Sequence, residues 1–178
     1  NASALHYHFG SRDGLLRALL EPFTGRVRTA RRQLIKELEQ EPSPRGAARA
    51  FVEPLAMMLE QTWRERAFLR ILGALAGDPR RTPRELVKLV GDTYAKQANA
   101  LLADGIPREL FGVRYPMAET MVLHVLADEA ARRDARTRPS GRDRLFTPSL
   151  VDAYLAAMTS PASAEVLSAL SVDAANSM

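Results

Sequence analysis

The chain has no cysteine and only three histidines among its 178 residues. Without cysteine it can form no disulfide, no thiolate metal site and no cysteine nucleophile. His6 and His8 lie two positions apart, while His124 is far away in the sequence. This set does not match the ligand spacing of a structural zinc site, so we expect neither a metal nor another cofactor.

Long hydrophobic runs are also missing. No apolar stretch approaches the roughly 18–20 residues that a membrane-spanning helix needs, and no signal peptide opens the chain. No segment alternates polar and apolar residues with the period of two that is typical of strands. We therefore expect an all-α protein of roughly eight or nine helices, located in the cytoplasm and with no membrane partner.

Catalytic constellations are absent as well. The sequence contains no nucleophile paired with a base, no cluster of carboxylates and no glycine loop of the kind that holds phosphates. Glu37, Glu39 and Glu41 alternate along the end of a predicted helix, so their carboxylates would not converge on one point. We do not expect an enzyme.

Positive charge gathers at the beginning of the chain. Hydrophobic residues make up 46% and charged residues 26%, which suits a soluble protein with a substantial core. The first 34 residues carry six arginines against Asp13 and Glu21, and the rest is balanced, so the whole net charge of +4 lies there. A polyanionic partner or a solvated basic helix face would each explain this asymmetry. Both explanations apply to four arginines on the long predicted helix, Arg26, Arg28, Arg31 and Arg32.

Apolar residues recur three and four positions apart along most of the chain, as on amphipathic helices. We expect Pro116, Pro148 and Pro161 to lie in the first turns of helices, where a proline is tolerated. The predicted helical segments span residues 1–9, 12–40, 45–60, 64–76, 84–103, 108–114, 116–135, 148–159 and 161–171.

Four residues are expected to shape the helix ends and bends. Ser11 is a suitable N-cap, because its side chain can accept a hydrogen bond from the first turn. Pro22 and Pro54 interrupt predicted helices, so we expect a kink near residues 18–22 and a bend at Pro54. Gly105 follows a predicted helix and is suited to a left-handed terminus.

The most specific text in the chain is the segment from Leu5 to Leu16, LHYHFGSRDGLL. It resembles the end of the helix-turn-helix in the TetR family of bacterial transcriptional regulators. The family pattern has a leucine, aromatic or polar residues, His-Phe, a small turn, a basic residue, an acidic or polar residue and paired leucines. The match covers twelve contiguous residues with the turn in the right place, and Arg12 stands where the family often has lysine.

The resemblance implies that residues 1–14 are the C-terminal part of a helix-turn-helix head, whose supporting helices lie upstream. A recognition helix needs small or polar residues near the base edges. The resemblance implies that Tyr7 and the residues before it contact bases or sugars, and that His6, His8 and Arg12 contact phosphates. The predicted DNA-binding residues are Asn1, Ala2, Ser3, Ala4, His6, Tyr7, His8 and Arg12.

The resemblance further implies that residues 15–178 form a helical ligand-binding and dimerisation domain. The predicted helices 116–135 and 148–159 carry apolar stripes, which can serve as core or as the seam of a homodimer. A twofold dimer suits a protein that reads two half-sites on DNA. The residues predicted for the interface are Met117, Val125, Leu150, Tyr154 and Met158.

An effector pocket is expected among the helices of this domain. Methionine adapts to varied ligands, and tryptophan and tyrosine offer flat faces with a polar tip. Each candidate can equally be an ordinary core residue, and His124 can equally be a core or interface histidine. The candidates are Met58, Trp63, Phe68, Tyr94, Gln97, Leu101, Met121 and His124.

Taken with the resemblance, these features predict a DNA-binding repressor, controlled by a small apolar or amphipathic effector. The alternative is an all-helical dimer that binds a small molecule and has no role on DNA. The segment from Leu5 to Leu16 favours the first interpretation.

Overall fold

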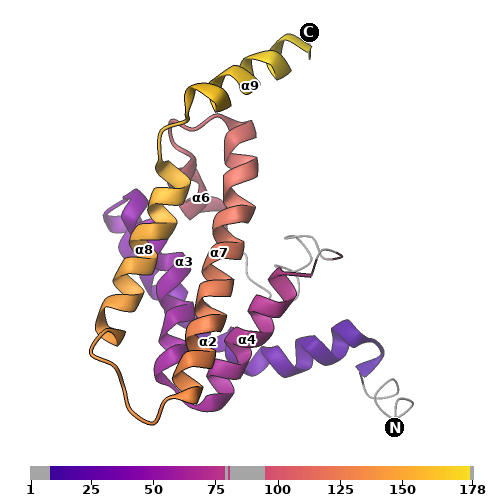
Figure 1. Cartoon of the computed structure of the whole chain (residues 1–178), viewed down its shortest axis with the longest axis vertical. Coiled ribbons are helices and arrows are strands. Elements are labelled where there is room, and N and C mark those ends of the chain that lie inside the picture. Colours follow the sequence, from indigo (N-terminus) through magenta and orange to yellow (C-terminus); the bar gives the residue numbers. More distant parts are fainter. Residues whose placement is uncertain (1–8, 79, 81–94, 177–178) are drawn as a thin grey trace.

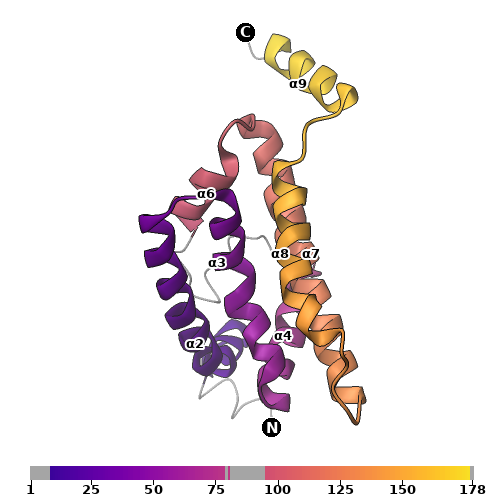
Figure 2. The ribbon, with the colours of Figure 1, turned by 90° about the vertical axis from the view of Figure 1, so that its left-hand side faces the viewer.

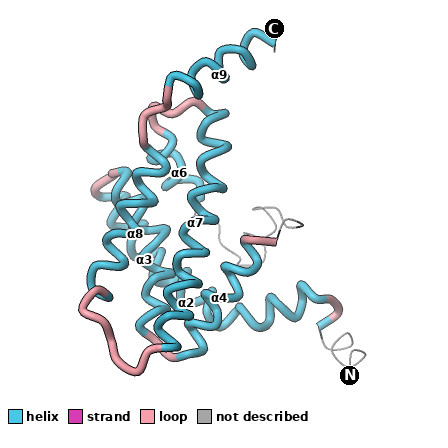
Figure 3. Tube along the Cα trace, viewed as in Figure 1, coloured by secondary structure: helices cyan, strands magenta, loops and turns pink. Residues whose placement is uncertain are grey.

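The computed structural model describes the backbone of residues 9–78, 80 and 95–176, and their side chains except those of 95–97 and 172–176. No strand occurs in this part, as Figure 3 shows, which confirms the expected all-α class. The helices are α2 (Arg12–Gln40), α3 (Pro44–Ala56), the 3₁₀ helix η1 (Met57–Glu60), α4 (Trp63–Ala76), α6 (Ala95–Ala103), α7 (Arg108–Ala135), α8 (Asp143–Thr159) and α9 (Ala164–Asn176).

The long helices form an elongated bundle (Figures 1 and 2). Helix α3 packs between α2 and α8, and α7 packs against both α4 and α8. The first turns of α2 leave the bundle at one end, and α9 extends beyond the opposite end. The bundle therefore has a basal end, where α2 begins, and an apical end beside α9.

The start of α2 follows the sequence signals. Gly10 has a φ of 68°, and Ser11 is extended and accepts a hydrogen bond of 3.0 Å from the Gly14 backbone N–H. Ser11 is therefore the N-cap, as predicted. The left-handed conformation expected at Gly105 is also confirmed, with a φ of 71° after the end of α6.

Helix α2 runs unbroken through Pro22. Figures 1 and 2 show that its first part leaves the bundle at an angle to the part along α3, as expected of a proline inside a helix. The domain boundary predicted between residues 1–14 and 15–178 falls inside this helix.

At two prolines the helix begins earlier in the chain than predicted. Pro116 does not open a helix, because α7 already begins at Arg108 and continues through it. The proline leaves the Gly112 carbonyl without its helical partner, but Gly112 is exposed, so water can bond that oxygen. Likewise α8 begins at Asp143, ahead of Pro148, because the Asp143 carboxylate accepts a 3.0 Å hydrogen bond from the Ser140 N–H and fixes the first turn.

The remaining differences are smaller. The helix predicted over 45–60 ends at Ala56 and tightens into η1, and the last helix begins at Ala164 rather than at Pro161. Of the helix predicted over 84–103, the described part is α6. The helix predicted over 1–9 lies outside the described residues apart from Phe9.

Helices α4 and α7 approach closely at a glycine. A Cβ atom at Gly73 would lie 2.5 Å from the Ala127 Cβ and 3.2 Å from the Leu123 carbonyl oxygen. The missing side chain therefore permits this contact. At Gly25 of α2, by contrast, an added Cβ would meet no atom within 4 Å.

The same substitution should have opposite effects at these two glycines. We expect Gly73→Ala to lower the free energy of unfolding by about 2 kcal/mol, because overpacking outweighs the better helix propensity. Gly25→Ala should raise it by about 0.5–1 kcal/mol. Urea denaturation measures both. The exchange Gly73→Ala/Ala127→Gly should recover most of the loss, and a stabilising Gly73→Ala would contradict the close contact.

Candidate functional site

The first turns of α2 are the described remainder of the predicted DNA-binding head. Arg12 is exposed at the first position of the helix. Phe9 and Leu19 are exposed apolar side chains on the same part, 36% and 51% accessible, so they offer an apolar surface outside the bundle core. The other predicted DNA-binding residues lie outside the described residues, namely Asn1, Ala2, Ser3, Ala4, His6, Tyr7 and His8.

Helix α2 is tied to α4 beside this end. Arg26 of α2 forms an ion pair with Glu65 and a 3.3 Å hydrogen bond with the Gln61 side chain. The Thr62 hydroxyl caps α4 by accepting a hydrogen bond from the Arg64 N–H, and it donates to the Glu65 carboxylate. This hydrogen bond, with support from Arg26, keeps the pKa of the buried Glu65 below its ordinary value against the effect of burial. A displacement of the start of α2 would therefore change the contacts at the start of α4.

A buried arginine lies at the centre of the bundle. The Arg31 side chain of α2 is 5% exposed, and its Nε donates a 3.0 Å hydrogen bond to the Ala50 carbonyl of α3. Pro54 has no N–H to bond this carbonyl, which would be its partner in a regular helix. Arg31 therefore satisfies the helical bond that Pro54 removes. Its guanidinium also lies 5.8 Å from the centroid of the Phe51 ring.

Acidic and aromatic groups accompany Arg31 in the core. Burial raises the pKa of Glu119 on α7, although the Tyr115 hydroxyl donates a 2.7 Å hydrogen bond to it and Arg31 attracts it. Tyr154 of α8 stacks on Phe51, with the ring centroids 4.9 Å apart. The centre of the bundle is therefore partly polar. The sequence analysis did not identify Glu119, and the proline at position 54 was the one signal for the role of Arg31.

The predicted effector residues that the structure describes fall into two groups, four in or against the core and two exposed. Met58 and Phe68 are fully buried, and Leu101 and Met121 pack against the same core. Trp63 is 63% exposed at the first turn of α4, under the Arg64 guanidinium. His124 is exposed, and its Nδ1 lies 2.9 Å from the Thr120 carbonyl oxygen. The remaining two predictions, Tyr94 and the side chain of Gln97, lie outside the described residues.

Three of the five predicted interface residues lie inside the chain's own core. Leu150, Tyr154 and Met158 are at most 5% exposed, so these side chains have no free surface for a second copy. The reason is that α8 packs against α3 and α7, and Tyr154 stacks on Phe51 of α3; Figure 2 shows α8 beside α3. Met117 is 67% exposed and Val125 is half-buried, so α7 retains the surface part of the predicted interface.

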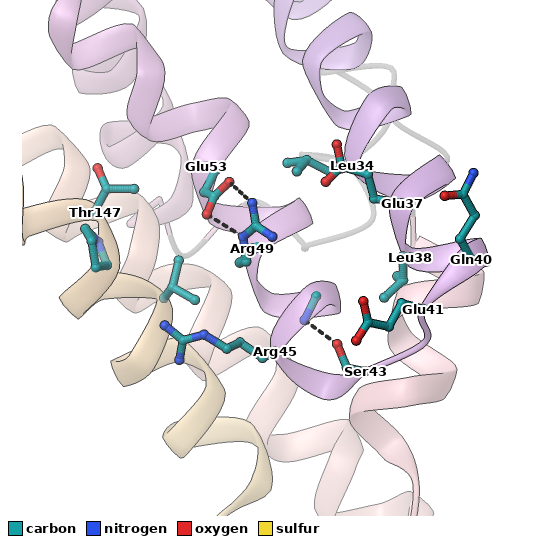
Figure 4. Close-up of a pocket in the computed structure, with 13 residues that line it drawn as sticks. Leu34, Glu37, Leu38, Gln40, Glu41, Ser43, Arg45, Arg49, Glu53 and Thr147 are labelled. Carbon is teal, nitrogen blue, oxygen red and sulfur yellow. Dashed lines mark hydrogen bonds and ion pairs between the residues drawn. The ribbon is translucent and has the colours of Figure 1, made fainter.

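A groove of about 900 Å³ opens on the side of the bundle, between the end of α2, helix α3 and the first half of α8 (Figure 4). Two pairs of oppositely charged side chains lie along the groove and make it polar. Arg49 and Glu53 are joined by two hydrogen bonds of 2.8 and 3.2 Å, and Arg45 pairs with Asp152 of α8. The lining residues are Leu34, Glu37, Leu38, Gln40, Glu41, Ser43, Arg45, Gly46, Arg49, Glu53, Thr147, Pro148 and Val151.

This groove differs from the expected effector pocket. Its lining includes none of the predicted effector residues that the structure describes, and it combines five charged side chains with two leucines, a proline and a valine. Such a surface suits a polar or amphipathic molecule better than an apolar one. The residues lie on helix ends that are brought together only by the packing of α3 against α2 and α8.

Two kinds of feature do not occur in the part of the chain that the structure describes, a cluster of metal ligands and a membrane-spanning helix. Within it, no three histidine, aspartate or glutamate side chains gather in a way that could hold a metal ion. Its helices also include none that is both long and apolar enough to cross a membrane.

Comparisons of the chain with protein-family models, with curated proteins and with solved structures give no match.

Proposed function

We propose that the chain is a TetR-like DNA-binding transcriptional regulator, a repressor whose operator binding is controlled by a small apolar or amphipathic effector. The segment from Leu5 to Leu16 carries this proposal, because its leucines, His-Phe pair, turn and basic residue follow the pattern of that family's reading head. The turn at Gly10 and the cap at Ser11 fit this pattern.

The surroundings of α2 support the proposal. Its first turns leave the bundle and expose Phe9 and Leu19, which gives the other helices of a head an apolar surface to pack on. The exposed Met117 on α7 offers apolar surface to a second copy. A homodimer places two such heads on one duplex, which is how helix-turn-helix proteins read twofold-symmetric sites.

The effector acts by binding two states of the bundle with different affinity. We infer that it binds among those residues of the predicted set that lie in the core, Met58, Phe68, Leu101 and Met121. The favoured state changes the direction of α2, and the contact of Arg26 with Glu65 transmits this change between α2 and α4. The separation of the two heads then no longer fits the operator.

Selection from a random DNA pool tests the proposal. The protein used is the chain together with any residues that its gene encodes ahead of Asn1. We expect a twofold-symmetric site to be enriched, and the double substitution Tyr7→Ala/Arg12→Ala to weaken binding to it by at least tenfold, roughly the loss of one base-directed or phosphate contact. Arg144→Ala, an exposed arginine on α8, is the matched control and should leave the selection unchanged.

The selection also separates the two candidate functions. If a folded, dimeric protein enriches no site at low salt, the chain is a helical small-molecule-binding dimer without a role on DNA. Enrichment that survives the double substitution would mean that a different surface reads the DNA.

A further inference from the structure

We propose that a small arginine-lined cavity at the basal end of the bundle binds a phosphate group. This inference stands apart from the proposed function. The cavity has a volume of about 240 Å³ and lies between η1, the start of α4, the end of α7 and the α7–α8 loop, at the lower end of the bundle in Figure 1. We name it the basal arginine cavity. It is lined by Leu59, Glu60, Arg66, Arg133, Arg136, Thr137, Arg138, Pro139 and Asp143.

One buried donor in this cavity lacks an acceptor. The Arg133 side chain is 8% exposed, its Nε donates a 2.9 Å hydrogen bond to Glu129, and its Nη1 pairs with Glu60. Its Nη2 is buried and has no hydrogen-bond partner within the described part of the chain. Buried donors in folded proteins nearly always have an acceptor, so an oxygen atom supplied from the cavity would complete this guanidinium.

The charge of the cavity favours an anion. Four arginines and two acids line it, so its side chains sum to two positive charges. Glu129 holds Arg133 and Arg136 in place, and Asp134 does the same for Arg66. The negative end of α7 lies nearby and opposes an anion, but full arginine charges exceed that partial charge.

One arginine of the cavity has a guanidinium group that forms no ion pair with the described part of the protein. Arg138 is exposed and makes no ion pair with any described residue, so its guanidinium is available to a ligand. Guanidinium groups match the oxygens of phosphate with two parallel hydrogen bonds. The volume is below the roughly 300–1,000 Å³ typical of sites for drug-sized ligands, so it fits one phosphate group rather than a large molecule.

The phosphate can be a free ion or part of a nucleic-acid backbone, since the basal end also carries the start of α2 (Figure 1). The test uses the full chain and two probes at constant ionic strength, inorganic phosphate and a short DNA duplex of arbitrary sequence. Isothermal titration calorimetry measures the affinity for each. Saturable binding of inorganic phosphate identifies the free ion, and saturable binding of the duplex without measurable binding of inorganic phosphate identifies the backbone.

Two variants locate the site. Arg138→Gln should weaken binding of the effective probe by about fivefold, as expected for one charge-assisted contact at an exposed rim. Arg133→Lys keeps the charge facing Glu129 but removes the Nη2 donor, and should weaken binding at least as much. Arg144→Gln removes an exposed charge outside the cavity and should have no effect. Thermal unfolding of each variant verifies its fold.

The proposal fails if neither probe binds saturably, which would mean that water alone satisfies the Arg133 donor. It also fails if Arg144→Gln weakens binding as much as Arg138→Gln, because the effect would then reflect general surface charge. Arg138 supports no internal contact, so this comparison remains informative even if Arg133→Lys does not fold.

Discussion

Replacing Arg31 with methionine should lower the free energy of unfolding by about 3 kcal/mol, although the new side chain is hydrophobic and of similar length. The substitution removes the Nε donor that lies 3.0 Å from the Ala50 carbonyl. Because Pro54 has no N–H, the Ala50 carbonyl would then be buried without a hydrogen-bond donor. Glu119 would also lose the cation that attracts it. Chemical denaturation of the two proteins measures the difference.

A second substitution tests this explanation directly. In the Arg31→Met background, Pro54→Ala restores an N–H that can bond the Ala50 carbonyl within α3. We expect the pair to be coupled by at least about 1 kcal/mol, the usual contribution of one hydrogen bond. Arg32→Met changes the exposed neighbour, whose side chain bonds Thr29, and should alter stability by less than about 0.5 kcal/mol. Strictly additive effects of Arg31→Met and Pro54→Ala would show that Arg31 does not replace the missing helical bond.

Glu129→Gln should lower the free energy of unfolding by a similar amount, about 3 kcal/mol at neutral pH. Glu129 is 7% exposed and accepts hydrogen bonds of 2.9–3.0 Å from Arg132, Arg133 and Arg136. A glutamine side chain is neutral, so it cannot balance the positive charges of these three arginines. Arg133, which is itself buried, would then depend on Glu60 alone for an ion pair. Asp128→Asn, at the exposed neighbouring position, is the control and should have little effect.

The pH dependence of stability separates Glu129 from Glu119. Burial acts to raise the pKa of Glu129, but the hydrogen bonds from Arg133 and Arg132 outweigh it and keep that pKa below the ordinary 4.5. The unfolded chain therefore binds the proton first, so the contribution of Glu129 is complete above pH 4.5 and is lost as pH falls through the folded pKa. Glu129→Gln should remove this loss in acid.

Glu119 should show the opposite slope. Its pKa is raised by burial, so between 4.5 and the folded pKa the folded state holds a proton that the unfolded state has released. Stability then falls as pH rises through this window, and Glu119→Gln should flatten that fall. Unfolding measured from pH 3 to 8, roughly the range in which carboxylates titrate, compares both variants with the parent chain. Equal slopes in the two variants would contradict the assignment.

The helical class followed from local patterns. The caps at Ser11 and Gly105 depend on the preferences of single residues for one backbone conformation, and both lie where those preferences place them. The predictions at prolines were less successful. A proline is compatible with the first turn and also with the interior of a long helix, and the choice depends on whether the freed carbonyl finds another partner. At Pro116 the freed Gly112 carbonyl is on an exposed residue and open to solvent, and at Pro54 the partner is Arg31.

Some of the predicted site residues lie in the core and others on the surface, for a similar reason. The apolar spacing on α8 correctly indicated a buried stripe, but it could not tell the face against α3 from a face for a second copy. For the same reason Trp63 and Met58 received the same prediction, although one is exposed and the other fully buried.

The sequence by itself determined the all-helical class, several helix boundaries, the basic beginning of the chain and the resemblance of Leu5 to Leu16, because these depend on residues close together in the chain. The tertiary structure alone decided that Arg31 meets Ala50, that Arg133 meets Glu60, and that Arg133 has one donor beside a cavity with no partner among the described residues. The first two contacts join residues 19 and 73 positions apart in the sequence. Their energy depends on burial and on the direction of side chains, which helix periodicity does not specify.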